Sequence, residues 1–306
     1  MTEYWTGYCS WLRSYRIGTR TFIGLLVAVI AVIATAVVAA LSSRPVPTPT
    51  PVTASADTRP SLRKVRRSRP PRRHRAAERR RARVARAGEY AAGRDGRVAF
   101  AVAGPDDEIH GRNEHELFQS ASVVKALILA AELQRLADAG GRLDPRTAAE
   151  LRRMITVSDN DAATAVFARV GPGGIEAIAH RGGMTDFRAS DSWGASEISA
   201  ADMATMFERL GRVFPERYEK FGLGLLGSIA FDQAWGIPEV AAERGWSVRF
   251  KGGWRTDPDG QIVNQVAELR RGGARRAIAV LTDGQPSMGY GIETIEGIAE
   301  RTLRGR

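Results

Sequence analysis

The sequence predicts an α/β (α+β) protein in which an all-helical lobe is inserted into a split strand-and-helix domain, behind an N-terminal membrane-spanning helix. Three observations support this. Residues 22–41 carry no charged side chain. A strand-like run at residues 97–104 comes before the helical patterns, and three further strand-like runs follow residue 245 before a helical tail. A strand kept apart from the other strands by helices is typical of a split domain.

Residues 22–41 are twenty consecutive uncharged positions, long enough to cross a hydrocarbon layer of ~30 Å as a helix. We expect an uncleaved transmembrane anchor. The alternative is a cleaved signal peptide, because Ala34-Thr35-Ala36 resembles a cleavage site, but the apolar stretch is longer than a usual signal core. Three arginines precede the span and two follow it nearby, so charge alone does not fix its orientation.

Residues 42–88 are expected to form a disordered Pro-rich and Arg-rich stalk. Residues 44–60 are rich in Pro and Thr, which favours an extended spacer. Residues 59–86 carry 14 Lys and Arg, and their Ala-rich second half favours a helix. Anionic lipid, a wall polymer and nucleic acid are the partners that such an arm could bind, and a solvated spacer is the alternative. Nucleic acid is disfavoured because no aromatic residue is interleaved with the arginines.

The positive charge belongs to this arm and not to the folded part. Residues 1–89 hold 18 of the 45 basic residues and four of the 34 acidic ones, so the remainder is slightly acidic. Residues 89–306 are expected to form one domain, with helices at residues 122–140, 145–157, 201–210 and 292–303. The boundary between its two lobes is a common place for a ligand.

Metal and cofactor chemistry are disfavoured. Cys9 is the single cysteine, which excludes a disulfide framework and a cysteine metal cluster. The four histidines do not have the spacing of a metal-binding motif such as H-x-x-x-H. They are His74, His110, His115 and His180. The G-x-G-x-x-G match at residues 222–227 does not follow a strand, so dinucleotide binding is not expected. No cofactor and no metal are predicted.

Ser122-Val123-Val124-Lys125 places a lysine inside an apolar run, one helical turn after a serine. Residues three apart share a helical face, so the Lys125 ammonium can reach the Ser122 hydroxyl. Apolar neighbours lower the pKa of a lysine and supply a neutral amine that can take the serine proton. A lysine that extends along a helix edge to solvent is the alternative. A second S-x-x-K, Ser61 to Lys64, lies in the arm, where no pocket could desolvate the lysine.

Two later motifs complete the set. Ser158-Asp159-Asn160 offers a hydroxyl that can relay a proton and an amide that can bond a substrate carbonyl, although such a triplet is also a common helix cap. Lys251-Gly252-Gly253-Trp254 follows a strand-like run, and its cation suits an anionic substrate end, while glycines allow close backbone approach. Taken alone, Lys-Gly-Gly is also a common turn.

In the order S-x-x-K, S-D-N, K-G-G, these motifs resemble those of the penicillin-recognising serine enzymes, and within them the class A β-lactamase-like serine hydrolases. The resemblance covers residues 88–306 and is most specific in FQSASVVK, from residue 118, and MITVSDNDA, from residue 154. Residues 198–207 also look like the family helix that follows its omega loop. The resemblance implies a β-lactamase/transpeptidase-like fold, which is an antiparallel sheet flanked by helices.

The resemblance also implies roles for matching residues. Ser122 would be the acylated nucleophile, Lys125 its base or proton relay, and Ser158 the residue that passes a proton to the leaving nitrogen. Asn160 and Lys251 would hold the substrate and its carboxylate. The backbone N–H groups of Ser122 and Trp254 would form the oxyanion hole. Together with Gly253, these residues are the predicted site: catalytic Ser122, Lys125 and Ser158, and substrate-binding Asn160, Lys251, Gly253 and Trp254.

Two departures from the family affect the expected activity. Gly252 stands where the family has a hydroxyl residue, which removes a hydrogen bond to a β-lactam carboxylate. Residues 184–197 lack the E-x-x-x-N pattern whose glutamate activates the deacylating water; Asp191 is a substitute candidate, in a segment that also fits a plain turn. Efficient β-lactamase activity is therefore not expected.

The sequence thus predicts a membrane-anchored, extracytoplasmic serine hydrolase that acts on a D-alanyl-type cell-wall peptide, a β-lactam or a related amide or ester. The outward location of the family makes residues 1–21 a cytoplasmic tail. The alternative is a penicillin-binding-like module that binds a wall ligand without efficient turnover.

Overall fold

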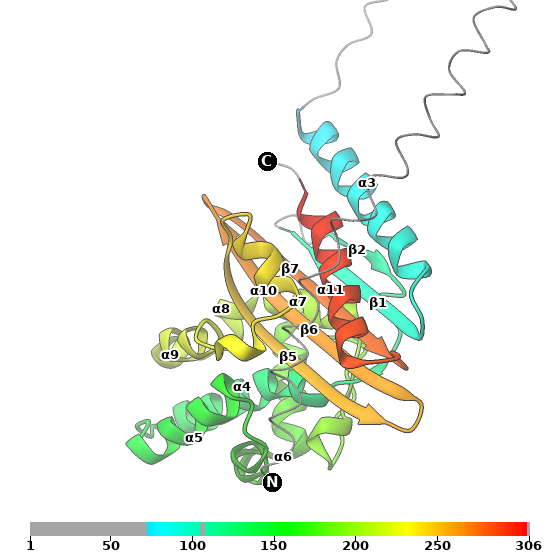
Figure 1. The fold of residues 1–306 in the computed structure, drawn as a ribbon. Coiled ribbons are helices and arrows are strands. Elements are labelled where there is room, and N and C mark those ends of the chain that lie inside the picture. Colours follow the sequence, from blue (N-terminus) through cyan, green and yellow to red (C-terminus); the bar gives the residue numbers. More distant parts are fainter. Residues whose placement is uncertain (1–71, 105–107, 305–306) are drawn as a thin grey trace, which may run out of the picture. The chain divides into compact units, whose positions relative to one another are not determined.

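The computed structural model describes residues 72–104 and 108–304, which lie in one compact unit, Ser68–Arg306. Its centre is an antiparallel sheet in the order β2-β1-β7-β6-β5 (Figure 1). The strands are β1 (Arg97–Ala103), β2 (Ile109–Arg112), β5 (Ser247–Asp257), β6 (Gly260–Arg271) and β7 (Ala274–Asp283). The predicted antiparallel sheet is confirmed.

The sheet is split in sequence and joined in space. Strands β5, β6 and β7 follow one another through tight turns, of which the last uses Gly272 and Gly273 at positive φ, a conformation that glycine adopts without steric cost. Strand β1 then pairs along β7, with Arg97 opposite Asp283 and Ala103 opposite Ala277. The early strand therefore completes a sheet made mostly by the C-terminal hairpins.

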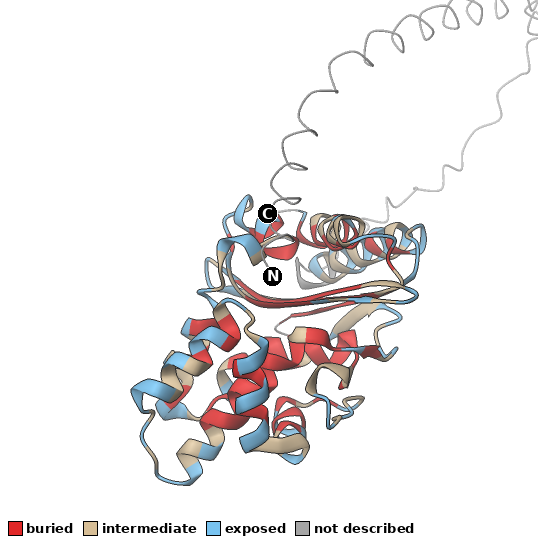
Figure 2. Cartoon of the chain, turned by 60° about the horizontal axis from the view of Figure 1, so that its bottom comes forward, coloured by how far each residue is buried: buried red, intermediate tan, exposed pale blue. Residues whose placement is uncertain are grey.

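Helices cover both faces of the sheet, as Figure 2 shows. On one face, α3 (Arg72–Ala92), α10 (Ile237–Ala242) and α11 (Met288–Leu303) pack over large side chains that include Phe100, Ile278 and Val280. On the other face, β1 and β7 present alanines, such as Ala101 and Ala279, to the core of the helical lobe. Small side chains let α7 (Ala200–Glu208) approach this face closely.

The helical lobe contains α4 (Lys125–Asp138), α5 (Pro145–Thr156), α6 (Asn160–Gly182), α8 (Leu210–Val213) and α9 (Glu216–Leu226). Short 3-10 turns lie at η2 (Ala121–Val124), η3 (Trp193–Ala195) and η4 (Phe231–Gln233), and a small ladder joins β3 (Phe118–Gln119) to β4 (Glu197–Ile198). Asp144 begins α5 by accepting bonds from the N–H groups of Arg146 and Thr147 at 2.9 and 3.0 Å.

The structure differs from the sequence predictions in several places. The helix predicted from residue 122 begins as a 3-10 turn and becomes α-helical at Lys125. Helix α6 was not predicted, and it is interrupted where Gly171 has a φ of 65°, just before Pro172. Strand β2 and helices α9 and α10 were also missed.

Helix α3 joins the compact unit, although residues up to 88 were predicted as stalk. The Tyr90 hydroxyl donates to the Glu293 carbonyl at 3.0 Å, and Gly297 leaves room for the Tyr90 ring against α11. Among the described residues, the predicted stalk therefore overlaps the compact unit over residues 72–88. The predicted membrane span, residues 22–41, lies outside the described residues, and none of the helices that the structure describes has the length and apolarity to cross a membrane.

Candidate active site

Ser122 lies in the turn η2, directly before α4. Ala121, its neighbour, has a φ of 44°, a conformation that side-chain-bearing residues seldom adopt and that often accompanies functional sites. Strand β5 runs against this turn so closely that a Cβ on Gly253 would lie 2.7 Å from the backbone nitrogens of Ser122 and Val123. Only glycine fits at position 253, and the edge strand β5 is thereby held beside the Ser122 turn.

Lys125 is fully buried at the start of α4, and its ammonium donates to three oxygens. It lies 2.6 Å from the Ser158 carbonyl, 3.2 Å from Ser158 Oγ and 2.7 Å from Asn160 Oδ1. No hydrogen bond joins Lys125 to Ser122, and the Ser122 hydroxyl forms none with any described residue. The ammonium is therefore held between the Ser122 turn and the Ser158 loop.

Ser158 and Asn160 are positioned by the turn between α5 and α6. Ser158 has a φ of 58°, and Asp159 begins α6 by accepting a bond from the Ala162 N–H at 2.8 Å. The Ser-Asp-Asn triplet is thus a helix cap, and the same cap directs Ser158 and Asn160 toward Lys125. The two interpretations of the triplet are compatible.

Lys251 reaches the same hydroxyl from the sheet. Its ammonium lies 3.1 Å from Ser158 Oγ and 2.8 Å from the Gly252 carbonyl, and its side chain is fully buried. Ser158 Oγ is therefore flanked by two lysine ammonium groups from different lobes. A hydroxyl between two titratable amines can give a proton to a leaving group and receive another in its place.

Both lysines have strongly lowered pKa values. Burial lowers the pKa of Lys125 to about 8, against the opposing attraction of Asp159. Burial lowers the pKa of Lys251 to about 7, and the nearby charge of Lys125 adds to this effect. Because the charges repel, the two groups titrate as a coupled pair. Both values lie close to neutrality, so either lysine can give or take a proton near neutral pH.

Tryptophans line the end of the K-G-G-W motif. Trp254 is 38% exposed, and its ring meets that of Trp235 edge to face, with 5.9 Å between centroids. A Cβ on Gly252 would lie 3.4 Å from the Trp235 ring. A side chain at position 252, where the family has a hydroxyl residue, would therefore lie in contact with the Trp235 indole.

A third tryptophan, Trp193, lies over Lys125. Its ring centroid is 4.8 Å from the Lys125 ammonium, and its Nε1 donates to Thr164 Oγ1 at 3.2 Å. Trp193 belongs to the 184–197 segment that lacks the family glutamate. Asp191 is exposed and makes no hydrogen bond or ion pair with a described residue. In this segment the side chain that meets Lys125 is therefore an indole, whereas the charge that attracts its ammonium, Asp159, belongs to the Ser158 loop.

The structure brings together all seven residues predicted for the site: Ser122, Lys125, Ser158, Asn160, Lys251, Gly253 and Trp254. Sequence reasoning missed Trp193 and Trp235, which only the fold places beside the motifs. It also missed the buried Asn264, whose amide donates to the Gln119 carbonyl at 2.8 Å and ties β6 to the segment before Ser122. A search of the described residues finds no group of side chains suited to hold a metal ion.

Comparisons with known proteins bear on the family and on the fold. A model of the beta-lactamase enzyme family matches residues 147–304. Among curated proteins, none matches the chain. The chain is similar to the solved structure of a beta-lactamase from Sphaerobacter thermophilus, with 21% identity over 73% of this chain and 96% of that chain and a TM-score of 0.61.

Two further solved structures are similar to the same extent. A class A beta-lactamase from Mycobacterium abscessus has 19% identity over 72% of this chain and 98% of that chain, with a TM-score of 0.63. A beta lactamase from Burkholderia vietnamiensis has 19% identity over 73% and 98%, with a TM-score of 0.64. At such identities the similarity establishes a common fold.

Proposed function

The chain belongs to the beta-lactamase enzyme family, and on this premise we propose that it is a serine hydrolase that forms an acyl-enzyme at Ser122. Its substrate is a D-alanyl-type cell-wall peptide, a β-lactam or a related amide or ester. The observation that carries the proposal is the convergence of Lys125 and Lys251 on Ser158 Oγ, at 3.2 and 3.1 Å, beside the Ser122 turn.

Acylation would proceed as follows. Neutral Lys125 takes the Ser122 proton, and Ser122 Oγ attacks the substrate carbonyl carbon. The backbone N–H groups of Ser122 and Trp254 stabilise the oxyanion. When the tetrahedral intermediate collapses, Ser158 gives its proton to the leaving nitrogen or oxygen and receives a proton from the lysine pair. Asn160 bonds the substrate, and Lys251 favours an anionic substrate end. Water then cleaves the ester at Ser122.

Labelling with a fluorescent penicillin and with a p-nitrophenyl ester, followed by intact-mass analysis, tests this function. We expect one acyl group per chain, absent in Ser122→Ala. Ser61→Ala is the matched control, because Ser61 belongs to the other S-x-x-K match. If no acyl donor gives an adduct at any dose, the alternative holds, and the protein is a binding module. An adduct that survives in Ser122→Ala would also contradict the proposal.

We also propose that residues 22–41 anchor the enzyme in the cell membrane with the catalytic domain outside the cytoplasm, and that residues 59–86 adhere to anionic lipid or wall polymer. The uncharged span and the basic arm in the sequence support this. A reporter fused after Arg306 should be active only outside the cytoplasm. A C-terminus protected from protease in intact spheroplasts would contradict the orientation.

A further inference from the structure

The large hydrophobic residues exposed in the described part of the chain gather around the candidate site. They are Val157, Phe231 and Trp254, with 52%, 97% and 38% of their surface exposed. Val157 precedes Ser158, and Trp254 follows Gly253. The Ala230 N–H donates to the Thr156 carbonyl at 2.8 Å, so Phe231 begins its turn beside the same loop.

The segment from Phe231 to Trp235 connects these residues into one border. Trp235 ends the segment against Trp254, and its carbonyl accepts a bond from Gln265 Nε2 at 2.7 Å. Gln265 is fully buried, and its Oε1 also accepts from the Ile237 N–H at 2.7 Å. The position of Trp235 is therefore fixed by the sheet, and its ring stands beside Gly252, where the family has a hydroxyl.

We infer that this apolar border, made of Val157, Phe231, Trp235 and Trp254, binds an aryl or alkyl group of the acyl donor. The inference rests on the proposed function and names its substrate class. Exposed apolar side chains that gather at one place mark a binding surface. Gly252 has no hydroxyl that could bind a substrate carboxylate. The indole of Trp235, which lies beside Gly252, offers apolar contact instead. The preferred donors are esters or amides that carry an apolar group.

A pair of matched esters tests the inference. The rate of Ser122 acylation is measured from p-nitrophenolate release with p-nitrophenyl phenylacetate and with p-nitrophenyl acetate. Their ratio of kcat/KM is then compared with their ratio for hydroxide-catalysed hydrolysis. We expect the enzyme ratio to exceed the hydroxide ratio at least tenfold, the factor that burial of one apolar ring provides.

Variants assign the preference to the border. Phe231→Ala should lower the enzyme ratio about tenfold, and Phe231→Leu should retain most of it. Trp235→Ala provides a second test if Phe231 variants fold poorly. An enzyme ratio equal to the hydroxide ratio, or one that neither alanine variant changes, overturns the inference and leaves the acyl-enzyme intact. If neither ester acylates Ser122, the proposed function itself fails.

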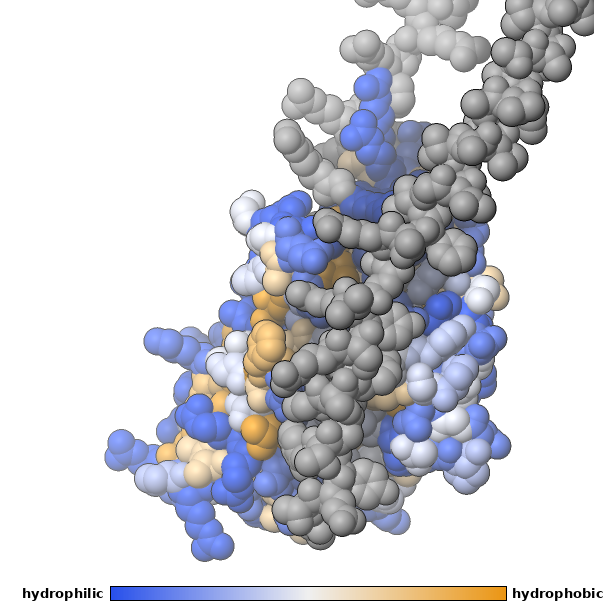
Figure 3. Space-filling model, in the orientation of Figure 1, coloured by the Kyte–Doolittle hydropathy of each residue, from blue (hydrophilic) through white to orange (hydrophobic). Residues whose placement is uncertain are grey.

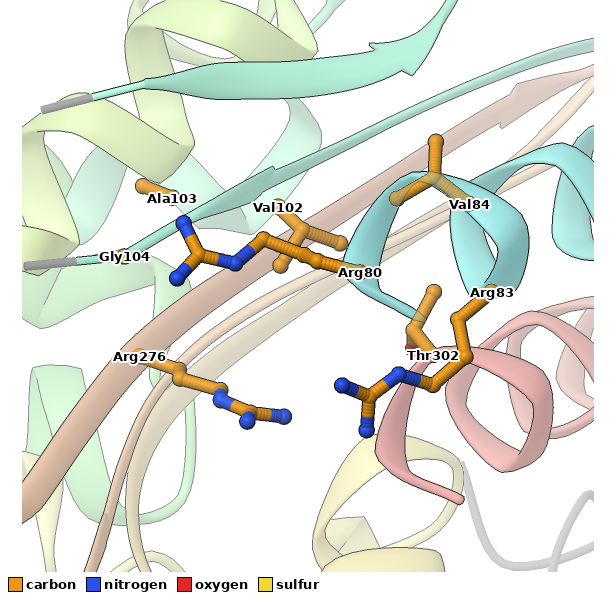
Figure 4. Close-up of a pocket in the computed structure, with 8 residues that line it drawn as sticks. All are labelled: Arg80, Arg83, Val84, Val102, Ala103, Gly104, Arg276 and Thr302. Carbon is orange, nitrogen blue, oxygen red and sulfur yellow. The ribbon is translucent and has the colours of Figure 1, made fainter. Parts of the chain in front are cut away.

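A second inference comes from the opposite face of the sheet and does not depend on the function. A small pocket there is lined by Arg80 and Arg83 of α3, Arg276 of β7 and Gly104 (Figure 4). In Figure 4 the guanidinium groups of Arg83 and Arg276 point toward each other, and that of Arg80 points toward Gly104. A Cβ on Gly104 would lie 3.2 Å from Arg80 Nη1, so glycine lets this guanidinium lie against the backbone.

Two of these arginines, Arg83 and Arg276, form no ion pair with a carboxylate among the described residues. Arg83 donates to two backbone carbonyls, those of Arg79 and Arg304, at 3.2 and 2.6 Å. Arg276 is half-buried above Trp246, with 5.5 Å to the ring centroid, and it pairs with no carboxylate in the described part of the chain. Burial, followed by Arg83 and Arg80, lowers the pKa of Arg276 to about 10. Figure 3 shows hydrophilic residues over the visible part of α3.

We infer that the arginine pocket, made of Arg80, Arg83 and Arg276, binds a phosphate group. Guanidinium groups match the geometry of phosphate oxygens and bind them in pairs. A phosphate would also relieve the repulsion between the three cations. Since α3 continues the basic arm that follows the predicted membrane span, a lipid headgroup and a free phosphate are the two sources of this chemistry.

The test uses the full-length protein in detergent. Inorganic phosphate is titrated by calorimetry, and the same titration is repeated with soluble short-chain phosphatidylglycerol and, for comparison, short-chain phosphatidylcholine. Arg276→Met, which keeps side-chain length over Trp246, should weaken phosphate binding at least tenfold. Arg152→Met is the matched control, because it removes the same charge from an exposed position of α5. Arg83→Met tests the same site if Arg276→Met fails to fold.

The two arms separate the sources. Binding of phosphate but not of short-chain phosphatidylglycerol indicates a free phosphate, and binding of short-chain phosphatidylglycerol that is lost in Arg276→Met indicates the lipid. Equal losses in Arg276→Met and Arg152→Met indicate unspecific attraction and overturn the inference. Asp106 and Asp107 follow Gly104 in the sequence. If phosphate binds only after both are changed to Asn, the pocket serves the chain's own carboxylates, and the inference is also wrong.

Discussion

Two groups of cations lie on opposite faces of the central sheet: two fully buried lysines on one face and half-buried arginines on the other. On the face of the helical lobe, Lys125 and Lys251 each donate to oxygens at the Ser158 loop or the sheet. On the face of α3 and α11, Arg276 meets other arginines and an aromatic ring. A lysine with a lowered pKa can lose its proton near neutral pH, whereas an arginine keeps its charge.

The difference indicates which chemistry each face supports. The lysine pair can exchange protons with a hydroxyl, so it suits catalysis. The arginine group keeps a fixed positive charge, so it suits the binding of an anion. Burial is common to both groups, and the titration range of the side chain distinguishes them.

The largest expected effect is on the lysine face. Lys125→Ala should lower the rate of Ser122 acylation ~10²–10⁴-fold, the usual contribution of a positioned base. The rate is measured by stopped-flow release of p-nitrophenolate. Lys220→Ala, which removes an exposed lysine from α9, is the matched control. Equal rates in the two variants would remove Lys125 from the mechanism.

The second effect concerns deacylation. No carboxylate adjoins Lys125 where the family has its glutamate, and Trp193 occupies that side. The acyl-enzyme should therefore persist for minutes, and a chromogenic cephalosporin should give a stoichiometric burst. Trp193→Glu should shorten its lifetime about 10²-fold by supplying a base, and Trp193→Phe should not. Fast turnover without a burst in the native protein would contradict this and make Asp191 the next residue to change.

The third effect is a pH dependence with a defined sign. The pKa of Lys125 is lowered to about 8, so its neutral form increases about tenfold for each pH unit below that value. Acylation by an uncharged ester should therefore rise with pH from 6 and level off above about 8. The profile is measured as the second-order rate constant of acylation. A flat profile over this range would show that Lys125 is not the base.

A fourth, smaller effect tests whether Trp235 prevents a hydroxyl at position 252 from improving acylation. Gly252→Ser alone should not improve acylation by benzylpenicillin, because the new side chain meets the Trp235 ring. Gly252→Ser combined with Trp235→Ala should acylate about tenfold faster than Trp235→Ala alone, which has lost contact with the aryl group of this penicillin, since the hydroxyl can then bond the carboxylate. Acylation constants of the single and double variants form a cycle. A gain in Gly252→Ser alone would show that Trp235 is not the obstacle.

The smallest effect is on the arginine face. Arg276→Met replaces a half-buried cation, surrounded by like charges, with an apolar side chain of similar length. In phosphate-free buffer the melting temperature should rise by about 2–4 °C, which is about 1 kcal/mol for a domain of this size. Added phosphate should raise the melting temperature of the native protein only. If the variant instead melts at a lower temperature than the native protein in phosphate-free buffer, the arginines do not destabilise the fold by repelling one another.

The motifs and the order of the main elements follow from the amino-acid sequence alone. Ser122 and Lys125 stand in an apolar run, and Lys251 follows a strand-like run, because the hydrophobic period and the local spacing are properties of the chain. The strands after residue 245 and the first strand were also predictable from alternation and turn residues. Their pairing in one antiparallel sheet came from the family resemblance.

The side chains that surround the motifs depend on how distant segments pack together. Trp193, Trp235 and Asn264 are far from Ser122 in the sequence, and the folded chain brings them to the site through side-chain packing and sheet register. Likewise, Arg276 meets α3 because β1 and α11 place residues from both ends of the unit side by side. Local spacing fixes which residues share a face, but contacts between distant segments depend on burial across the whole domain.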